Sequence, residues 1–516
     1  GVVGHRDCII DGCLVDVKAL SARHALCDVD TFTRYSALYT GGRAFRALVP
    51  SFLCRQTQDT DKAYALRCKE ASYTPYVGQI VRAYAGALFT SPYAIRAKRS
   101  GQDIELADEY AAFKEDVDAC GTDATAFFKD RFRSALVFGT SHWTVELPRG
   151  DVDSTAEGAA RGLDRVKLRP MDAASVLDWE VDDDGGYAWV KTYESALRRS
   201  APGAPLRVVD TWRVYWPDHV DVFQLEYQQN KKPRPTTQVP LVDSYPHGFS
   251  RVPILSLRLP DGMWLLDSAA DAQIEHFRLS AALGWSLRRC AYPIAILKLG
   301  SNTDEVPPVG PGLGIKLGTE ESFEWAEPSG SSLVVLRDEI KSKKDEIYRV
   351  SQQMAMSVDN SSAAVGRSGL SKMQDAAAAD ACLRDFAHVV REAVEATMEF
   401  VSNAHEDYDT TFHIDGFDTF STADVESIVD AAKAASELGI EDASETYRVE
   451  IHTRVAHALL PADARQDVKD AIRKEIKRSA RATKRTKAAA GSPDGTKPNG
   501  ESRTTPGGTP APGSED

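Results

Sequence analysis

One run of carboxylates has the residue types of a metal site. Glu180–Asp184 carries four acidic side chains within five residues, and hard cations such as Mg²⁺ prefer carboxylate oxygens as ligands. Two glycines follow directly, which is typical of a solvated β-turn. The turn is the simpler interpretation, and a metal-dependent hydrolase or nuclease centred on Glu180–Asp184 is the alternative.

Three other motifs resemble catalytic or nucleotide-binding signatures, and each lacks a part that the chemistry requires. Gly366–Lys372 has the composition but not the spacing of a phosphate-binding loop. Gly310–Gly314 has alternating glycines, but it contains a proline and opens no helix. Gly139–Trp143 lacks the second glycine of a nucleophile elbow. We therefore predict no catalytic residue, no metal ligand and no cofactor.

The composition is that of a large protein with an acidic surface. The chain has 516 residues, and 62 Lys and Arg against 76 Asp and Glu give a net charge of −14, which argues against general binding of polyanions. No apolar run approaches the ~18–20 residues that cross a bilayer, so we expect a soluble, cytosolic protein without membrane contact. The eight scattered cysteines predict free thiols rather than a disulfide framework.

One segment near the C-terminus reverses the acidic trend. Between Arg473 and Lys487, eight basic residues stand against Glu475. A solvated helix end is one interpretation, because cations suit the C-terminus of a helix; a surface that contacts phosphates is the other. The basic residues are Arg473, Lys474, Lys477, Arg478, Arg481, Lys484, Arg485 and Lys487.

The first half of the chain predicts an α+β unit. Apolar and aromatic residues at helical spacing indicate helices between residues 30 and 86 and between 105 and 138. Short alternating runs separated by turn residues indicate strands up to about residue 259. The predicted strands are Ser141–Leu147, Val166–Leu168, Ser175–Val181, Tyr187–Tyr193, Leu206–Tyr215 and Val220–Tyr227.

The second half is mainly helical. Two helices, Asp267–Cys290 and Arg337–Met354, flank a segment rich in Pro and Gly, in which Ile294–Leu299, Gly314–Leu317 and Leu333–Leu336 are expected as short β-type runs. A polar segment of small residues then precedes a helix expected over Ser371–Glu406, without Pro or Gly. Three more helices are expected over Thr422–Leu438, Ala443–Leu459 and Pro461–Lys487, and residues 488–516 have the composition of a disordered tail.

This order of elements resembles that of the portal proteins of tailed bacteriophages, which form the head-to-tail connector. Local motifs are also similar to that family, and the resemblance covers roughly residues 30 to 480. These motifs are Tyr39–Arg43, Tyr64–Arg67, Tyr73–Pro75, Gly86–Phe89 with Pro92, Val252–Leu255 and Gly366–Leu370.

The resemblance implies an α+β portal-like fold with named parts. It also implies a homo-oligomeric ring, usually of twelve subunits, around double-stranded DNA. The implied parts are a wing over residues 1–266, stem helices over 267–291 and 337–354, a clip over 292–336, a tunnel loop over 355–371, a long wing helix with a following strand over 372–420, a helical crown over 421–487 and a tail over 488–516.

The same resemblance implies partners, a location and sites. The partners are the terminase large subunit, the head-completion adaptor, and the major capsid and scaffolding proteins; the location is the virion, after assembly in the host cytoplasm. For the tunnel loop the implied DNA contacts are Asp359, Asn360, Ser361, Ser362, Arg367 and Ser368. For the stem, the candidates for channel or inter-subunit contacts are Arg278, Arg288, Arg289, Lys341, Lys343 and Lys344. A cytosolic scaffold without a DNA role is a further alternative.

Overall fold

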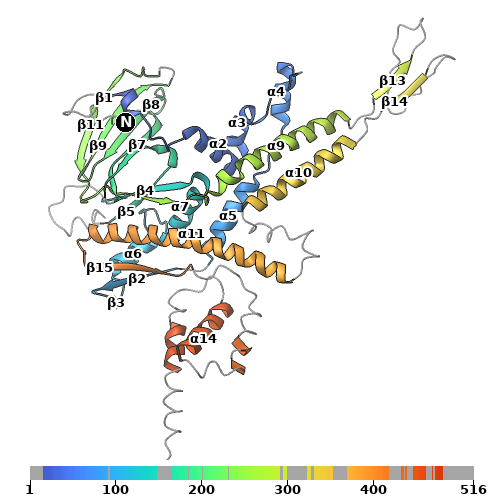
Figure 1. The fold of residues 1–516 in the computed structure, drawn as a ribbon. Helices are drawn as coiled ribbons and strands as arrows, with labels where there is room; N and C mark the ends of the chain where they lie inside the picture. The colour runs from blue at the N-terminus through green and yellow to red at the C-terminus, as the bar shows by residue number, and fades with distance from the viewer. Residues whose placement is uncertain are drawn as a thin grey trace, which may run out of the picture. The chain divides into compact units, whose positions relative to one another are not determined.

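The computed structural model describes most of the chain, which divides into two units, Gly1–Ser421 and Thr422–Asp516 (Figure 1). The described residues are 15–57, 59–90, 93–147, 165–183, 185–199, 201–229, 232–290, 294–298, 322–326, 331–351, 369–417, 432–434, 436–437, 445–460, 468 and 471–479. Within these ranges the side chains of 289–290, 294–297 and 369–381 are among those not described.

Helices begin the first unit, and polar caps set where several of them start. Asp28, Thr60 and Asp123 each accept a hydrogen bond from the backbone N–H three residues ahead, which satisfies a donor that the helix itself leaves unpaired. Gly41 separates α2 from α3 at a φ of 66°, where glycine is favoured. The helices are α1 (Val17–Leu20), α2 (Val29–Thr40), α3 (Gly42–Phe52), α4 (Asp61–Glu70), α5 (Tyr76–Leu88), α6 (Asp108–Glu115) and α7 (Ala124–Phe138).

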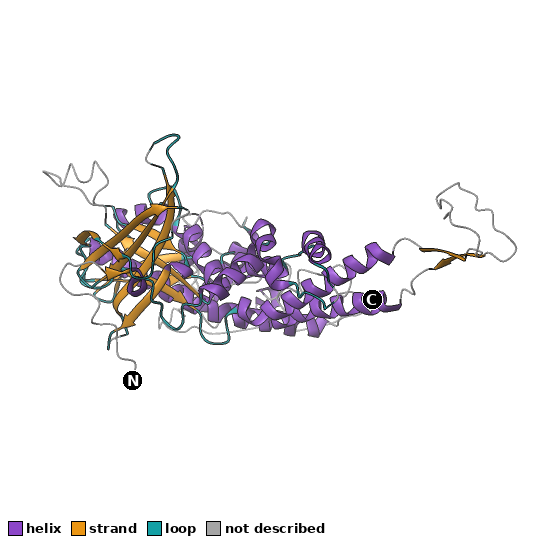
Figure 2. Cartoon of the chain, turned by 90° about the horizontal axis from the view of Figure 1, so that it is seen from above, coloured by secondary structure: helices purple, strands orange, loops and turns teal. Residues whose placement is uncertain are grey.

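The strands form antiparallel sheets. The largest has the order β11-β9-β8-β7-β6, and two three-stranded sheets have the orders β12-β4-β5 and β15-β2-β3. Their bounds are β2 (Ala94–Arg99), β3 (Gln102–Ile104), β4 (Thr140–Glu146), β5 (Lys167–Met171), β6 (Val176–Val181), β7 (Tyr187–Arg198), β8 (Arg207–Tyr215), β9 (His219–Gln228), β11 (Leu241–Pro246), β12 (Ile254–Arg258) and β15 (Thr410–Asp415). Two small pairs join β1 (Val15–Asp16) to β10 (Gln238–Val239) and β13 (Ile294–Lys298) to β14 (Ser322–Ala326). Figure 2 draws all strands in orange.

Three long helices complete this unit: α9 (Leu265–Cys290), α10 (Ser331–Val350) and α11 (Gly369–Ala404). Helices α9 and α10 run side by side, with the β13–β14 pair between them in the chain (Figure 1). The start of α9 and the second half of α11 share one apolar core with α5 and α7. The strands and helices together make an α+β fold, as the sequence predicted.

The three long helices predicted between residues 267 and 406 are confirmed, with shifted ends. The first starts at Leu265 instead of Asp267, and the long one spans Gly369–Ala404 instead of Ser371–Glu406. The prediction of a β-type run at Leu333–Leu336 is wrong, because these residues belong to α10, which begins at Ser331 rather than Arg337. Four consecutive apolar residues have no period that distinguishes strand from helix. The run at Gly314–Leu317 lies outside the described residues.

The second unit contains α14 (Glu445–Leu459), which matches the helix predicted over Ala443–Leu459. The described parts of the neighbouring predicted helices are helical, at residues 432–434, 436–437, 468 and 471–479. The predicted tail, 488–516, lies outside the described residues. Among the helices that the structure describes, none has the length and apolar character to span a membrane.

Candidate functional site

The α9–α10 pair is the candidate functional element, and the two halves of α9 have different surroundings. In the first half, Leu266 and Ala269 are completely buried and Phe277 is 1% exposed. In the second half, no side chain from Arg278 to Arg288 is buried, although the segment is rich in leucine. The apolar side chains of this second half are Leu279, Leu283, Trp285 and Leu287.

The side of α10 that faces away from α9 is also partly apolar near the same end. Val334 is 53% exposed and Val335 is 62% exposed, and Leu287 on α9 is 44% exposed. The remaining outer face of α10 is charged, with Asp338, Glu339 and Lys341 exposed. Among the described residues, this end of the helix pair therefore carries exposed apolar side chains, and adjoining apolar surface is a feature of surfaces that bind another protein.

Two of the predicted stem arginines contact helices α3 and α4. The Nε of Arg278 donates to the carbonyl oxygen of Phe52 at 2.8 Å. Arg288 forms an ion pair with the carboxylate of Glu70 and donates to the Glu70 carbonyl oxygen at 3.3 Å. Both contacts are made within one chain, so the guanidinium groups are engaged on the side of α9 that faces these helices. The side chain of Arg289 is outside the described residues.

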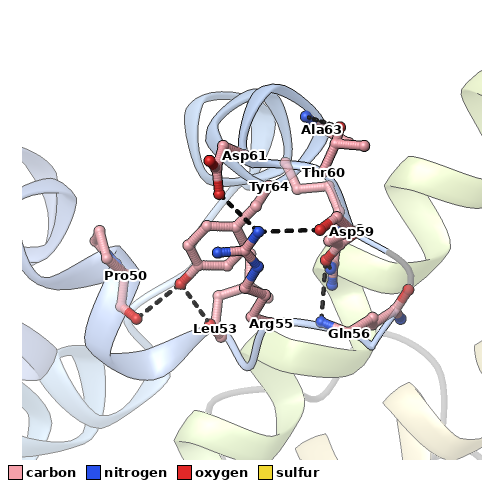
Figure 3. A network of polar contacts seen from close by, with 10 residues as sticks. Pro50, Leu53, Arg55, Gln56, Asp59, Thr60, Asp61, Ala63 and Tyr64 are labelled. Atoms are coloured by element: carbon pink, nitrogen blue, oxygen red, sulfur yellow. Dashed lines mark hydrogen bonds and ion pairs between the residues drawn. The ribbon is translucent and has the colours of Figure 1, made fainter.

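The α3–α4 hairpin, Gly42–Glu70, is held together by a polar network at its turn (Figure 3). Arg67 forms an ion pair with Asp59, and their side chains are 7% and 9% exposed. The Tyr64 hydroxyl donates to the carbonyl oxygens of Pro50 at 2.9 Å and Leu53 at 3.0 Å. Arg55 forms an ion pair with Asp61 at 2.6 Å. These contacts join the end of α3 to the start of α4.

The lysines predicted on the second stem helix have three different environments. Lys343 donates to Glu346 at 2.8 Å; this hydrogen bond raises the pKa of Lys343 and lowers that of Glu346. The Lys344 ammonium lies 5.6 Å from the ring centres of Tyr76 and Tyr348, in cation–π contact. Lys341 is exposed.

Lys344 also faces a buried histidine of α9. His276 is 5% exposed and lies edge-on to Tyr76, with ring centres 5.1 Å apart. Burial is the main cause that lowers the pKa of His276, and the Lys344 ammonium lowers it further. This cluster of His276, Lys344 and Tyr76 joins α9, α10 and α5.

A buried hydrogen bond helps to fix the C-terminal end of α10 to the core, together with the buried side chains of Ile347 and Tyr348. The Tyr84 hydroxyl of α5 donates to the Ser351 carbonyl oxygen at 2.8 Å. A cavity of about 20 Å³ adjoins this contact, lined by Tyr84, Ser351, Cys382 and Phe386 among others. A cavity of this size holds about one water molecule, and the Ser351 hydroxyl has no protein partner there. The chain enters the predicted tunnel loop directly after this contact.

Several of the residues predicted to contact DNA lie outside the part of the chain that the structure describes. Asp359, Asn360, Ser361, Ser362, Arg367 and Ser368 lie outside the described residues. So do Arg481, Lys484, Arg485 and Lys487 of the basic segment. The other four basic residues, Arg473, Lys474, Lys477 and Arg478, lie on the helix over residues 471–479. Arg473 forms an ion pair with Glu450 of α14 at 3.6 Å.

The carboxylate run has the local contacts of a β-turn. Asp182 accepts from the Gly186 N–H at 2.7 Å, and Glu180 accepts from the Trp189 indole at 2.9 Å. Asp184 is outside the described residues. In the part of the chain that the structure describes, no three His, Cys, Asp or Glu side chains are grouped as metal ligands would be.

Three comparisons with known proteins bear on this region. Residues 265–403 match a family model described as a domain of unknown function, DUF4055. Its limits coincide with the start of α9 and the last turn of α11. No curated protein matches the chain. A solved chain from a structure described as "Virion of native gene transfer agent (GTA) particle" is similar, with 12% identity, a TM-score of 0.43, and coverage of 79% of this chain and 98% of that chain.

The α3–α4 hairpin was not among the sites predicted from sequence. Its partners on α9 lie more than 200 residues away: 226 between Phe52 and Arg278, and 218 between Glu70 and Arg288. The available signal was local, because Tyr64 and Arg67 stand in one of the motifs that resemble portal proteins. Nothing in the sequence indicates that α9 supplies the groups that bind the ends of α3 and α4.

Proposed function

We propose that this chain is a portal subunit, and that many copies close into a ring around double-stranded DNA. The observation that carries the proposal is the second half of α9 with the adjoining end of α10. Leu287, Val334 and Val335 expose apolar surface there, although the helix pair is long and regular. A ring of identical subunits covers such surfaces by packing each helix pair against its neighbours.

The arrangement of elements supports the proposal further. Two side-by-side helices flank a β-pair, and a 36-residue helix, α11, follows them. This is the order of stem, clip, stem and long wing helix in portal proteins. In the proposal, α9 and α10 are the stem, the clip predicted over residues 292–336 ends where α10 begins at Ser331, and the tunnel loop predicted over residues 355–371 reaches the channel.

The charge distribution suits a channel through which DNA slides. The chain has a net charge of −14, and an acidic wall would make few persistent contacts between lysine and phosphate. The basic helix over residues 471–479 and the residues that follow it are the exception, and in the proposal they lie at one opening of the channel. ATP hydrolysis belongs to a separate packaging motor, and this chain carries no enzymatic step.

The proposal includes partners and a location. The ring docks the terminase large subunit during packaging and the head-completion adaptor afterwards, and it contacts the major capsid and scaffolding proteins in the shell. It resides at one vertex of the virion and assembles in the host cytoplasm. Twelve is the subunit number that the resemblance implies.

A loop replacement tests the proposed channel. Residues 359–368 are replaced by a Gly/Ser linker of equal length, and packaged DNA is measured by nuclease protection. We expect rings to assemble normally and the protected DNA to fall, because the polar contacts of the loop are gone. Deletion of residues 488–516 is the matched control and leaves assembly unchanged. Normal packaging by the linker variant would contradict the channel assignment.

A further inference from the structure

The carbonyl groups at the C-terminal end of α3 are bound by side chains from elsewhere in the fold. The last four carbonyls of a helix lack partners within the helix. In α3, the Pro50 carbonyl accepts from Tyr64 at 2.9 Å, and the Phe52 carbonyl accepts from Arg278 at 2.8 Å. A guanidinium is favoured at this end, because the helix dipole places partial negative charge there.

Helix α4 ends in the same way. The Lys69 carbonyl accepts from Arg46 of α3 at 2.8 Å. The Glu70 carbonyl accepts from Arg288 of α9 at 3.3 Å, and the Glu70 carboxylate forms an ion pair with the same guanidinium. Arginine is suited to this double role, since its planar fork presents several N–H donors at once.

These two contacts hold α9 at two points. Arg278 and Arg288 are ten residues apart, which corresponds to about 15 Å along a helix. One point of attachment leaves a helix free to pivot, whereas two points fix its direction. The hairpin that supplies both points is itself held together by the buried ion pair between Arg67 and Asp59.

We infer that the α3–α4 hairpin is a bracket that fixes the direction of α9 beyond Phe277, with Arg278 and Arg288 as its positioning residues. The bracket acts on the part of α9 that lies beyond the apolar core. No side chain from Arg278 to Arg288 is buried there. The functional meaning rests on the proposed portal function: the bracket sets the angle between stem and wing, and hence the course of the channel wall.

Hydrogen exchange of the full-length protein tests the bracket. The double variant Arg278→Gln/Arg288→Gln removes both points and is compared with Arg337→Gln, which removes a positive charge from exposed surface of α10. We expect amide exchange in residues 279–288 to rise about fivefold in the double variant and to stay unchanged in the control. Exchange in α7 and β4 is expected to stay unchanged in both.

Two further variants separate the bracket from general support of the fold. The charge exchange Glu70→Arg/Arg288→Glu restores the ion pair but not the hydrogen bond to the carbonyl of residue 70, so we expect its exchange in residues 279–288 to lie between that of the single variant Arg288→Glu and that of the wild type. Arg288→Lys keeps the positive charge but lacks the planar guanidinium. We therefore expect amide exchange in residues 279–288 of this variant to lie between that of the wild type and that of Arg288→Gln.

Three results would overturn the inference: unchanged exchange in the double variant, failure of the charge exchange to restore protection, or a rise that extends equally to α7 and β4. The last result would mean that the arginines stabilise the core instead of directing α9. The measurement does not depend on ring formation. A chain that never forms rings and still shows the restored protection would refute the portal proposal and leave the bracket intact.

Discussion

The two halves of α9 belong to one helix, yet they are held in place by different forces. Before Phe277 the helix is buried among α2, α5 and α7 in the main core. After Phe277 it is held by α10 and by arginine contacts to the α3–α4 hairpin, and its apolar side chains stay half-exposed. The difference indicates that the first half specifies the fold of the subunit; in the proposed ring, the second half is left for contacts with neighbouring subunits.

The largest expected effect lies in the buried half. Phe277 is 1% exposed and lies edge-on to Phe45, with ring centres 4.8 Å apart. We expect Phe277→Ala to lower the free energy of unfolding by about 3–5 kcal/mol, because the truncation leaves a cavity in a packed core. The control Leu287→Ala, in the exposed half, is expected to cost less than about 1 kcal/mol. Denaturant titration measures both, and equal losses would contradict the comparison.

A charge placed on the exposed apolar end of α10 should impair assembly without lowering the stability of the subunit. Val335 is 62% exposed, so Val335→Asp is expected to change the free energy of unfolding by less than about 0.5 kcal/mol. In the proposed ring, the new carboxylate is buried against a neighbour, and the protein concentration needed for assembly rises about tenfold or more. Light scattering across a concentration series measures this. Val242→Asp, the same substitution at a valine of β11 that is 51% exposed, should assemble as the wild type does.

The buried contact at the end of α10 is expected to have an intermediate effect. Tyr84→Phe removes the hydroxyl that donates to the Ser351 carbonyl. The cost should be about 1–2 kcal/mol, since the buried carbonyl loses its partner. Thermal denaturation measures it against Tyr408→Phe, in which the replaced side chain is 74% exposed. A loss no larger than that of the control would mean that α10 is anchored by other contacts.

The smallest expected effect is dependent on pH and salt. The Lys343 hydrogen bond lowers the pKa of Glu346 below its ordinary value of 4.5. A carboxylate with a lowered pKa contributes stability above its unfolded pKa and loses it as the pH falls through the folded pKa. Near neutral pH, Glu346→Gln should raise exchange in α10 about twofold. The difference between variant and wild type should vanish in strong acid and shrink at about 1 M salt; a difference that persists in acid would contradict the ion-pair account.

The sequence predicted those elements whose signals are local. Residues 371–404 show an uninterrupted helical period, and the structure has a helix there. The alternating runs near Tyr187 and Arg207 became β7 and β8. By contrast, Leu333–Leu336 is a continuous apolar run without a period, and the prediction of a strand there was wrong.

The sequence predicted the helices of the candidate site but not the contacts between them. The resemblance to portal proteins placed Arg278 and Arg288 on the correct helix, but their partners Phe52 and Glu70 lie on α3 and α4, more than 200 residues away in sequence. When a distant arginine caps a helix C-terminus, no local sequence pattern at either position indicates the contact. The pairing of β2 with β15 was missed for the same reason, since Ala94–Arg99 and Thr410–Asp415 meet only in the folded chain.

The central claim is that many copies of this chain close into a ring, and electron microscopy of the purified full-length protein tests it most directly. We predict annular particles of one subunit number, with a central opening wide enough for a DNA duplex. Single subunits at micromolar concentration, or rings whose opening is too narrow for the duplex, would contradict the account.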